Sequence, residues 1–274
     1  MSTFSGHLQL CAARRAHGRT VLATQSFRAP FHLSKPYWDS DASVLIAQVV
    51  NPTAGILAGD RLESEIAVEA GGSLLVTTPS ASRVFKMRNG AAESVQRFSV
   101  AAEASLEVLP EPLVPHRGST FRQATTVELA PRATLFYVDQ LLPGRVHHGE
   151  AWEWDRLRLE LEVRLGGELV LRERFDQTGA DLHALAEFSG SGPAACFANA
   201  VLFAPAAAET PLWRGAIAAL HCDGVWAGVS ALRRDGWSLK FVAPDSVRLR
   251  RVLREARKIL AAYFPALGAD PRKL

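Results

Sequence analysis

Four short windows of this sequence share one pattern of apolar residues around a leucine. The anchoring leucines are Leu74, Leu106, Leu135 and Leu169, spaced by 32, 29 and 34 residues. Every position eight and six residues before each anchor, and two residues after it, is apolar. These twelve positions are Ile66, Val68, Val76, Phe98, Val100, Val108, Val127, Leu129, Tyr137, Leu161, Val163 and Leu171. A repeat of this period constrains the fold more than any other feature of the chain.

Apolar residues two positions apart predict strands with one buried face, because side chains alternate across a strand. The residues between the two apolar rows of each unit are small or turn-prone, so each unit is predicted to be an antiparallel hairpin. A lone hairpin is marginal in water, and the four units should therefore stack. We predict a mainly-β fold in which repetitive antiparallel hairpins stack into a β-helix-like, two-layered body over residues 1–178. A plain β-sandwich is the alternative.

Residues 179–274 have a different pattern and are predicted to form a smaller α+β portion, packed on this body or continuous with it. Strands are expected at 195–203, 225–232 and 237–242, and a helix at 210–221 that starts with Thr210 and Pro211. A last helix, capped by Asp245 or Ser246, completes a βαββα order. Its many arginines form either a solvated face or an electrostatic docking face.

Composition places the chain among ordinary water-soluble proteins. Its 274 residues include 31 Lys and Arg against 28 Asp and Glu, and this balance gives no argument for nucleic acid or anionic lipid as a partner. The first residues lack the pattern of a secretory signal, and no run of about 18 apolar residues suits a membrane span. Three cysteines without CxxC spacing indicate reduced thiols. We expect a cytoplasmic location.

The usual catalytic signatures are missing from the sequence, which contains no GxSxG, P-loop, GxGxxG or HExxH motif. A binding or assembly role is therefore expected rather than catalysis. The strongest local feature is the segment 51–60, in which Asn51, Pro52, Gly55 and Gly59 dictate an irregular path that ends at Asp60.

An acidic string follows this segment. Glu63 and Glu65 fall on the strand face opposite Ile66 and Val68. This row is either the solvated side of a strand or the lining of a polar groove, where hard oxygen ligands would bind a divalent cation weakly.

A set of motifs, in order along the chain, resembles the urease accessory proteins of the UreD type, also called UreH. The motifs are Asn51-Pro52 with Gly55 and Gly59-Asp60, Thr77-Thr78, Ser82 with Arg83-Val84-Phe85, Leu109-Pro110-Glu111, Gly144-Arg145, Gly149-Glu150 and Arg172-Glu173-Arg174. Each motif is weak alone, but their order and spacing over residues 8–274 are specific.

The resemblance implies a non-catalytic scaffold of β-helix-like fold for urease maturation and nickel insertion. Its implied partners are a UreF-type accessory protein, a UreG-type GTPase reached through that complex, and apo-urease, without nucleic acid or membrane. It implies transient Ni²⁺ and no tightly bound cofactor. Carried over by position, the candidate ligands of an internal nickel passage are Asp60, Glu63, Glu65, Asp139 and Glu173, with Ser82 nearby.

Two other functions stay open from the residues alone. A carbohydrate-active β-solenoid enzyme would use a carboxylate pair such as Asp60 and Glu63 as acid and base. A protein that binds anionic surfaces would use the arginine-rich last helix, and its binding would depend steeply on salt.

Overall fold

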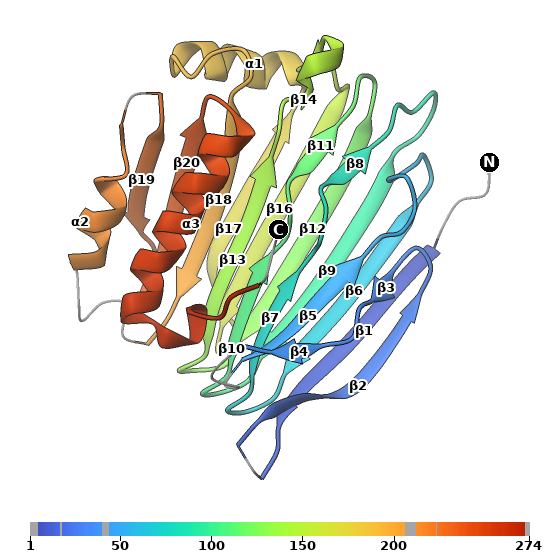
Figure 1. The fold of residues 1–274 in the computed structure, drawn as a ribbon. Helices are drawn as coiled ribbons and strands as arrows, with labels where there is room; N and C mark the ends of the chain where they lie inside the picture. Colours follow the sequence, from blue (N-terminus) through green and yellow to red (C-terminus); the bar gives the residue numbers. More distant parts are fainter. Residues whose placement is uncertain (1–4, 17, 40–43, 206–211, 223, 272–274) are drawn as a thin grey trace.

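Two β-sheets packed face to face make up most of the molecule (Figure 1). In the computed structural model, residues 5–16, 18–39, 44–205, 212–222 and 224–271 are described. Within them, the seven-stranded sheet consists in spatial order of β17 (Glu168–Gln177), β16 (Arg156–Leu165), β12 (Thr120–Leu129), β9 (Ala92–Val100), β6 (Arg61–Val68), β1 (Ser5–Arg14) and β2 (Thr20–Arg28).

The second sheet has eleven strands in the described part of the chain. Its main path is β19 (Trp226–Ala231), β20 (Gly236–Ala243), β18 (Cys196–Phe203), β13 (Thr134–Leu141), β10 (Ser105–Leu109), β7 (Ser73–Thr77), β5 (Leu45–Val50) and β3 (His32–Leu33). Beside this path lie β4 (Tyr37–Trp38), β8 (Ser82–Val84) and β11 (Leu113–Pro115).

The remaining elements are short or helical. They are the strands β14 (Gly144–Arg145) and β15 (Glu150–Ala151), the 3-10 turns η1 (Val146–His148) and η2 (Pro265–Leu267), and the helices α1 (Gly179–Phe188), α2 (Leu212–Ala218) and α3 (Ser246–Tyr263). None of the helices described is both long enough and apolar enough to cross a membrane.

The predicted repeat is present, and its units stack in two layers as expected. Strands β6, β9, β12 and β16 pair in parallel in one sheet, and β7, β10 and β13 pair in parallel in the other. The anchors Leu74, Leu106 and Leu135 are direct neighbours on adjacent strands. The mainly-β, solenoid-like body is therefore confirmed.

The antiparallel hairpin is wrong for the first three units. Each of them leaves one sheet after its first strand and enters the other sheet with its second strand, so the two strands face each other across the core. Alternating apolar residues describe a hairpin and such an arch equally well, because the period of two is the same in both. In the arch, the apolar rows of the two strands face each other and bury one another between the two sheets.

The fourth unit does form a hairpin, since β16 and β17 pair antiparallel in the same sheet. The register between its first strand, β16, and β12 of the third unit differs by two residues from the predicted one. Val127 lies beside Val163, whereas the pattern had placed Leu161 there. A shift of two residues keeps every side chain on its face and is therefore invisible in the sequence.

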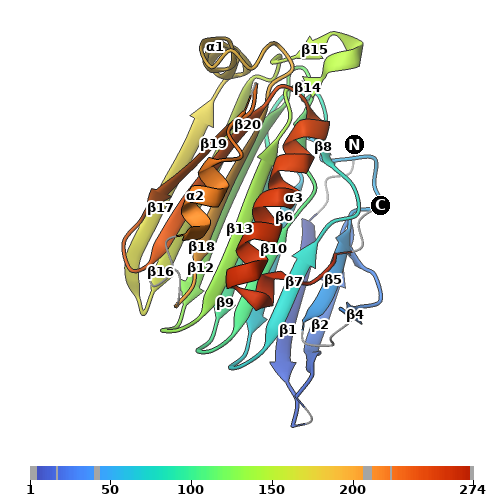
Figure 2. The same cartoon turned by 60° about the vertical axis from the view of Figure 1, so that its left-hand side comes forward.

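The main core lies between the two sheets. It includes the buried side chains of Ile66, Phe98 and Val127 on the seven-stranded sheet and of Leu74, Leu106 and Leu135 on the other. A second apolar cluster covers the outer face of the eleven-stranded sheet, where α2 and α3 pack across β18 and β20 (Figure 2). Both faces of the middle strands β10 and β13 are thereby largely shielded from water.

The C-terminal elements follow the predicted βαββα order as β18, α2, β19, β20 and α3. Asp245 caps α3, because its Oδ1 accepts a hydrogen bond of 2.8 Å from the amide of Arg248. The predicted helix start at Thr210 and Pro211 lies outside the described residues. Helix α1 was not predicted. Strand β18 pairs antiparallel with β13, so the sheet runs without interruption from the repeats into this portion.

Candidate functional site

Polar side chains interrupt the apolar inner face of the seven-stranded sheet at two successive rungs. Ser94 lies beside Gln123 on one rung, and Gln96 lies between Ser64 and Thr125 on the next. These residues keep the same inward alternation as Ile66, Phe98 and Val127, so they face the other sheet rather than solvent. Where there is room beside them, polar groups inside a mainly apolar body can bind water or a polar ligand.

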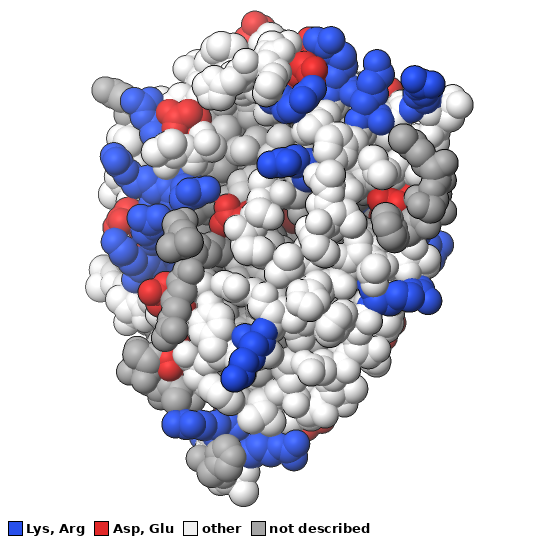
Figure 3. All heavy atoms as spheres, turned by 45° about the vertical axis from the view of Figure 1, so that its right-hand side comes forward, with Lys and Arg blue, Asp and Glu red and all other residues white. Residues whose placement is uncertain are grey.

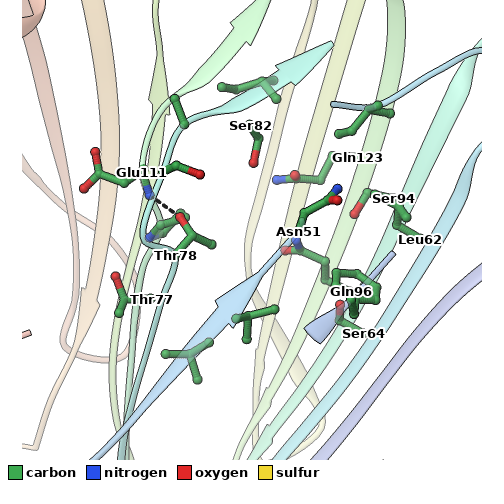
Figure 4. A pocket seen from close by; sticks show the side chains of 18 of the residues that line it. Asn51, Leu62, Ser64, Thr77, Thr78, Ser82, Ser94, Gln96, Glu111 and Gln123 are labelled. Carbon is green, nitrogen blue, oxygen red and sulfur yellow. Dashed lines mark hydrogen bonds between the residues drawn. The ribbon is translucent and has the colours of Figure 1, made fainter. Parts of the chain in front are cut away.

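A first cavity of about 260 Å³ lies at these rungs. Its mouth is bordered by Asn51, Thr78, Ser82 and Glu111, and Ser64, Ser94, Gln96 and Gln123 line it deeper inside (Figure 4). The Thr78 hydroxyl accepts a hydrogen bond of 2.8 Å from the amide of Glu111 and so ties two loops of the mouth together. Apolar side chains such as Ile66 and Phe98 make up the rest of the lining, and most of its polar groups are hydroxyls and amides.

Asp139 also lines this cavity. Its Oδ1 accepts hydrogen bonds from the Tyr137 hydroxyl at 2.8 Å and from Gln123 Nε2 at 3.1 Å. Burial raises the pKa of Asp139 to about 6, although these two hydrogen bonds and the Lys240 charge act in the opposite direction. At neutral pH the side chain is therefore a carboxylate, and it binds a proton readily in mild acid.

A second cavity, of about 510 Å³, is also bordered by Asp139, which thus borders both. Asp139, Asn199 and Lys240 are direct neighbours on β13, β18 and β20. Glu173 reaches them from β17 of the opposite sheet, accepting a hydrogen bond of 2.6 Å from Asn199 Nδ2 and forming an ion pair with Lys240. Burial lowers the pKa of Lys240 to about 8, while the Asp139 carboxylate acts to raise it.

The other walls of the second cavity are mainly apolar, with Phe175, Phe197 and Phe241 among them. Glu160 also lines it and is paired with Arg158 and Arg174. Its rim carries Leu185 and Phe188 of α1 and Trp226 of β19, which are 51%, 91% and 48% exposed. Among the described residues, the Oδ1 of Asn199 is buried without a hydrogen-bond partner. The floor therefore offers an acceptor beside two carboxylates and one ammonium group.

The structure brings together only part of the predicted ligand set. Asp139 and Glu173 both border the second cavity, and Ser82 borders the mouth of the first. Glu63 and Glu65 lie on the outer face of the seven-stranded sheet, where they pair with Arg61 at 2.8 Å and Arg97 at 3.6 Å. They line neither cavity, because the strand alternation that the sequence revealed turns them to solvent.

Asp60 is 3% exposed and belongs to a turn. Its Oδ2 accepts a hydrogen bond of 2.8 Å from the amide of Leu57, and it is not among the residues that border either cavity. No cluster of three or more His, Cys, Asp or Glu side chains suited to a metal ion occurs within the described residues.

The other motif residues have identifiable structural roles. Asn51 Oδ1 accepts hydrogen bonds from the amide and hydroxyl of Thr53, which fixes the turn after Pro52. At Gly55 a Cβ atom would lie 2.6 Å from the Phe85 ring, so the turn needs glycine for close packing.

Gly59 and Gly144 have positive φ angles of 84° and 115°. Arg145 binds Glu150 at 2.7 Å across the small β14–β15 pair.

Sequence reasoning missed most of the polar lining. Gln96, Gln123, Tyr137, Asn199 and Lys240 stand in the site, yet none belongs to the predicted set. A signal was present, because Ser64, Gln96 and Thr125 occupy inward positions two residues from the apolar rows. Polar residues at predicted core positions need hydrogen-bond partners inside the protein, so they indicate a polar interior.

Comparison with known proteins places the chain in one family. Residues 5–273 match the family described as UreD urease accessory protein. A urease accessory protein UreD from Opitutus terrae is 63% identical over 99% of both chains. One from Yersinia enterocolitica is 41% identical over 53% of this chain and 45% of its own, and one from Actinomyces naeslundii is 28% identical over the full length of both.

Proposed function

Because the chain belongs to the UreD family of urease accessory proteins, we propose that it is a non-catalytic scaffold that passes Ni²⁺ through its interior to apo-urease. The observation that carries this proposal is the position of Asp139, which borders both cavities. The two cavities and this carboxylate form the passage, which leads from the Asn51 and Ser82 mouth to the rim made by α1 and β19.

The chemistry of the passage suits a mobile divalent cation. Asp139 and Glu173 supply negative charge, and hydroxyl and amide oxygens of Ser64, Gln96 and Gln123 line the approach. Such hard oxygen groups bind a borderline cation weakly compared with a cage of imidazole and thiolate. Transport needs binding strong enough for entry and weak enough for release, and spaced single carboxylates meet this requirement.

Lys240 limits how tightly the second cavity can hold a cation. Its ammonium group pairs with Glu173, and its partner at the next strand position is Asn199. A Ni²⁺ ion arriving at Glu173 competes with this ammonium for the same carboxylate. We therefore expect Lys240 to move away from Glu173 when the cation is bound, which keeps the ion from being held too tightly.

Urease maturation in cells that co-express urease and this chain tests the passage. Asp139→Asn and Glu173→Gln keep the side-chain shape but remove the charge, and each should lower the nickel content and activity of the purified urease several-fold. Glu63→Gln is the matched control, since its carboxylate lies on the outer face, and it should leave both values unchanged.

The same samples separate transport from assembly. Co-purification of urease with the Asp139→Asn chain should equal that of the original chain, because the residue is enclosed between the sheets. Normal nickel content in both charge-removing variants would rule out the passage.

The exposed apolar rim of the second cavity supports a docking role for a partner of the maturation complex. Phe188 is almost fully exposed at 91%, and Trp226 donates a hydrogen bond of 2.8 Å to the carbonyl of Ser189 just after α1. Large exposed aromatic groups around a cavity mouth are typical of protein interfaces. We assign this rim to the UreF-type accessory protein, which would link the chain to the UreG-type GTPase. Apo-urease would bind at the other mouth, and the whole complex would lie in the cytoplasm.

Neither alternative function gains support from the site. Asp60 is a buried turn residue and Glu63 faces solvent, so they do not form an acid–base pair in one cavity. The arginines of α3 are partly committed to partners of this chain, since Arg257 binds Glu107 and Arg250 lies 3.4 Å from Glu111. The last helix therefore packs against its own sheet on that side.

A further inference from the structure

Strand β2 is an open edge of the seven-stranded sheet. It pairs with β1 on one side only, and it forms the outer margin of the molecule in Figure 1. Thr20 is tied down, because its carbonyl accepts a hydrogen bond from Trp38 and its hydroxyl accepts one from the amide of Ser73. Within the described residues, 21–27 make no hydrogen bond on the side away from β1.

This edge lacks the features by which proteins usually protect edge strands. Residues 20–27 contain no charge and no proline. The opposite edge of the same sheet, β17, carries five charged residues among ten, namely Glu168, Arg172, Glu173, Arg174 and Asp176. Charges at an edge prevent pairing with another chain, and their absence permits it. The edge β2 is therefore suited to accept a strand, whereas β17 is blocked.

The segment that contains β1 and β2 is basic, and the acidic side chains near it include Glu69, 3.5 Å from Cys11, and Asp39, next to Trp38. Residues 5–38 contain no aspartate or glutamate, and they contain Arg14, Arg15, Arg19, Arg28 and Lys35. Basic side chains gather at the lower tip of the molecule, where the β1–β2 hairpin ends (Figure 3). All four arginines are exposed and stand at the two ends of β2.

We propose that β2 binds an extended, acidic segment of a partner protein, which adds a strand to the seven-stranded sheet. Main-chain hydrogen bonds along residues 21–27 hold the segment, and its carboxylates at either end meet Arg15 and Arg19 or Arg28. A second copy of this chain fits less well, since antiparallel pairing of two β2 strands brings Arg28 of one copy toward Arg19 of the other. This role goes beyond nickel passage and does not depend on it.

The inner side of β2 adds an apolar contact for such a segment. Phe27 lies opposite Leu8 and is 41% exposed, with its ring edge-on to His32 at 5.5 Å. An apolar residue of the bound strand at this level packs against Phe27. Alternating apolar and polar residues with acidic ends are thus the pattern that the edge recognises.

A pair of peptides tests the proposal on the full chain. The acidic peptide is acetyl-Glu-Glu-Val-Thr-Val-Thr-Val-Glu-Glu-amide, and the control replaces each Glu by Lys. At low salt the acidic peptide should bind at least ~10-fold more tightly than the lysine peptide. The ratio of the two affinities should shrink in 0.5 M salt, because the electrostatic screening length falls to about 4 Å. Hydrogen exchange of the amides in residues 21–27 should slow when the acidic peptide is bound.

Three variants identify the strand and the charges. Thr24→Pro prevents strand addition at the middle of β2 and should abolish the protection. The double change Arg15→Glu and Arg19→Glu leaves the strand intact and should reverse the preference between the two peptides. Arg251→Glu with Arg254→Glu on α3 is the control for charge alone and should change neither result. Equal binding of both peptides, protection located outside residues 20–28, or no binding of either would overturn the proposal.

Discussion

The ion pair between Arg257 and Glu107 should be one of the most sensitive points of the fold. Arg257 of α3 reaches the outer face of the eleven-stranded sheet, where its Nε and Nη2 lie 2.5 and 2.8 Å from the two oxygens of Glu107. The Glu107 side chain is only 2% exposed and that of Arg257 15%. The same guanidinium donates a hydrogen bond to the carbonyl of Ala269, so it also fastens the segment after α3.

Replacing Arg257 by methionine keeps most of the aliphatic volume and removes the charge. The buried Glu107 carboxylate then loses the Arg257 guanidinium, and breaking a buried ion pair in this way costs about 3–5 kcal/mol of unfolding free energy. This loss corresponds to roughly two to four powers of ten in the folding equilibrium constant. The double variant Glu107→Leu with Arg257→Met removes both charges and should recover most of the loss, because an apolar pair avoids the desolvation of two ions.

Urea unfolding followed by circular dichroism measures both variants. The midpoint should fall in Arg257→Met with little change in slope, and Arg254→Met on the exposed side of α3 should stay within about 0.5 kcal/mol of the original protein. A loss below about 1 kcal/mol in Arg257→Met would be that of an exposed pair and would refute the reasoning. A double variant less stable than the single one would refute it as well.

Two further outcomes are expected. The pKa of Asp139 is raised to about 6 in the folded chain, above about 3.9 in the unfolded chain, so its contribution to stability is fully present below pH 4 and is lost as the pH rises through 6. The free energy of unfolding of Asp139→Asn should therefore rise relative to that of the original chain between pH 4 and 7, by at most about 2 to 3 kcal/mol. Thermal or urea unfolding measures this, and parallel curves of stability against pH for the two proteins would contradict it. Phe188→Asp should weaken co-purification of the UreF-type partner by at least ~10-fold, since burying a phenylalanine contributes about 2 kcal/mol or more. Val247→Asp on α3, which is 70% exposed, is its control, and equal losses in both would remove the rim from the interface.

The sequence by itself determined the strands of the repeat, the order of the C-terminal elements after α1, and which face of each repeat strand is buried. The apolar rows around Leu74, Leu106 and Leu135 predicted stacked strands in two layers, and the 3.6-residue period after Asp245 predicted α3. These properties depend on neighbours within a few residues, which is why a single chain reveals them. The ordered motifs also led to the family, which the match over residues 5–273 confirms.

The tertiary structure alone decided how the strands pair and which polar residues meet. Alternation with period two is the same in a hairpin and in an arch between two sheets, so parallel stacking could not be predicted from it. The same alternation turned Glu63 and Glu65 outward, away from the cavities in which the prediction had placed them. Asp139, Glu173 and Lys240 come from strands separated by dozens of residues, and only cross-strand register and the facing of two sheets bring them together at one point. Their meeting depends on contacts between distant parts of the chain, which no local pattern encodes.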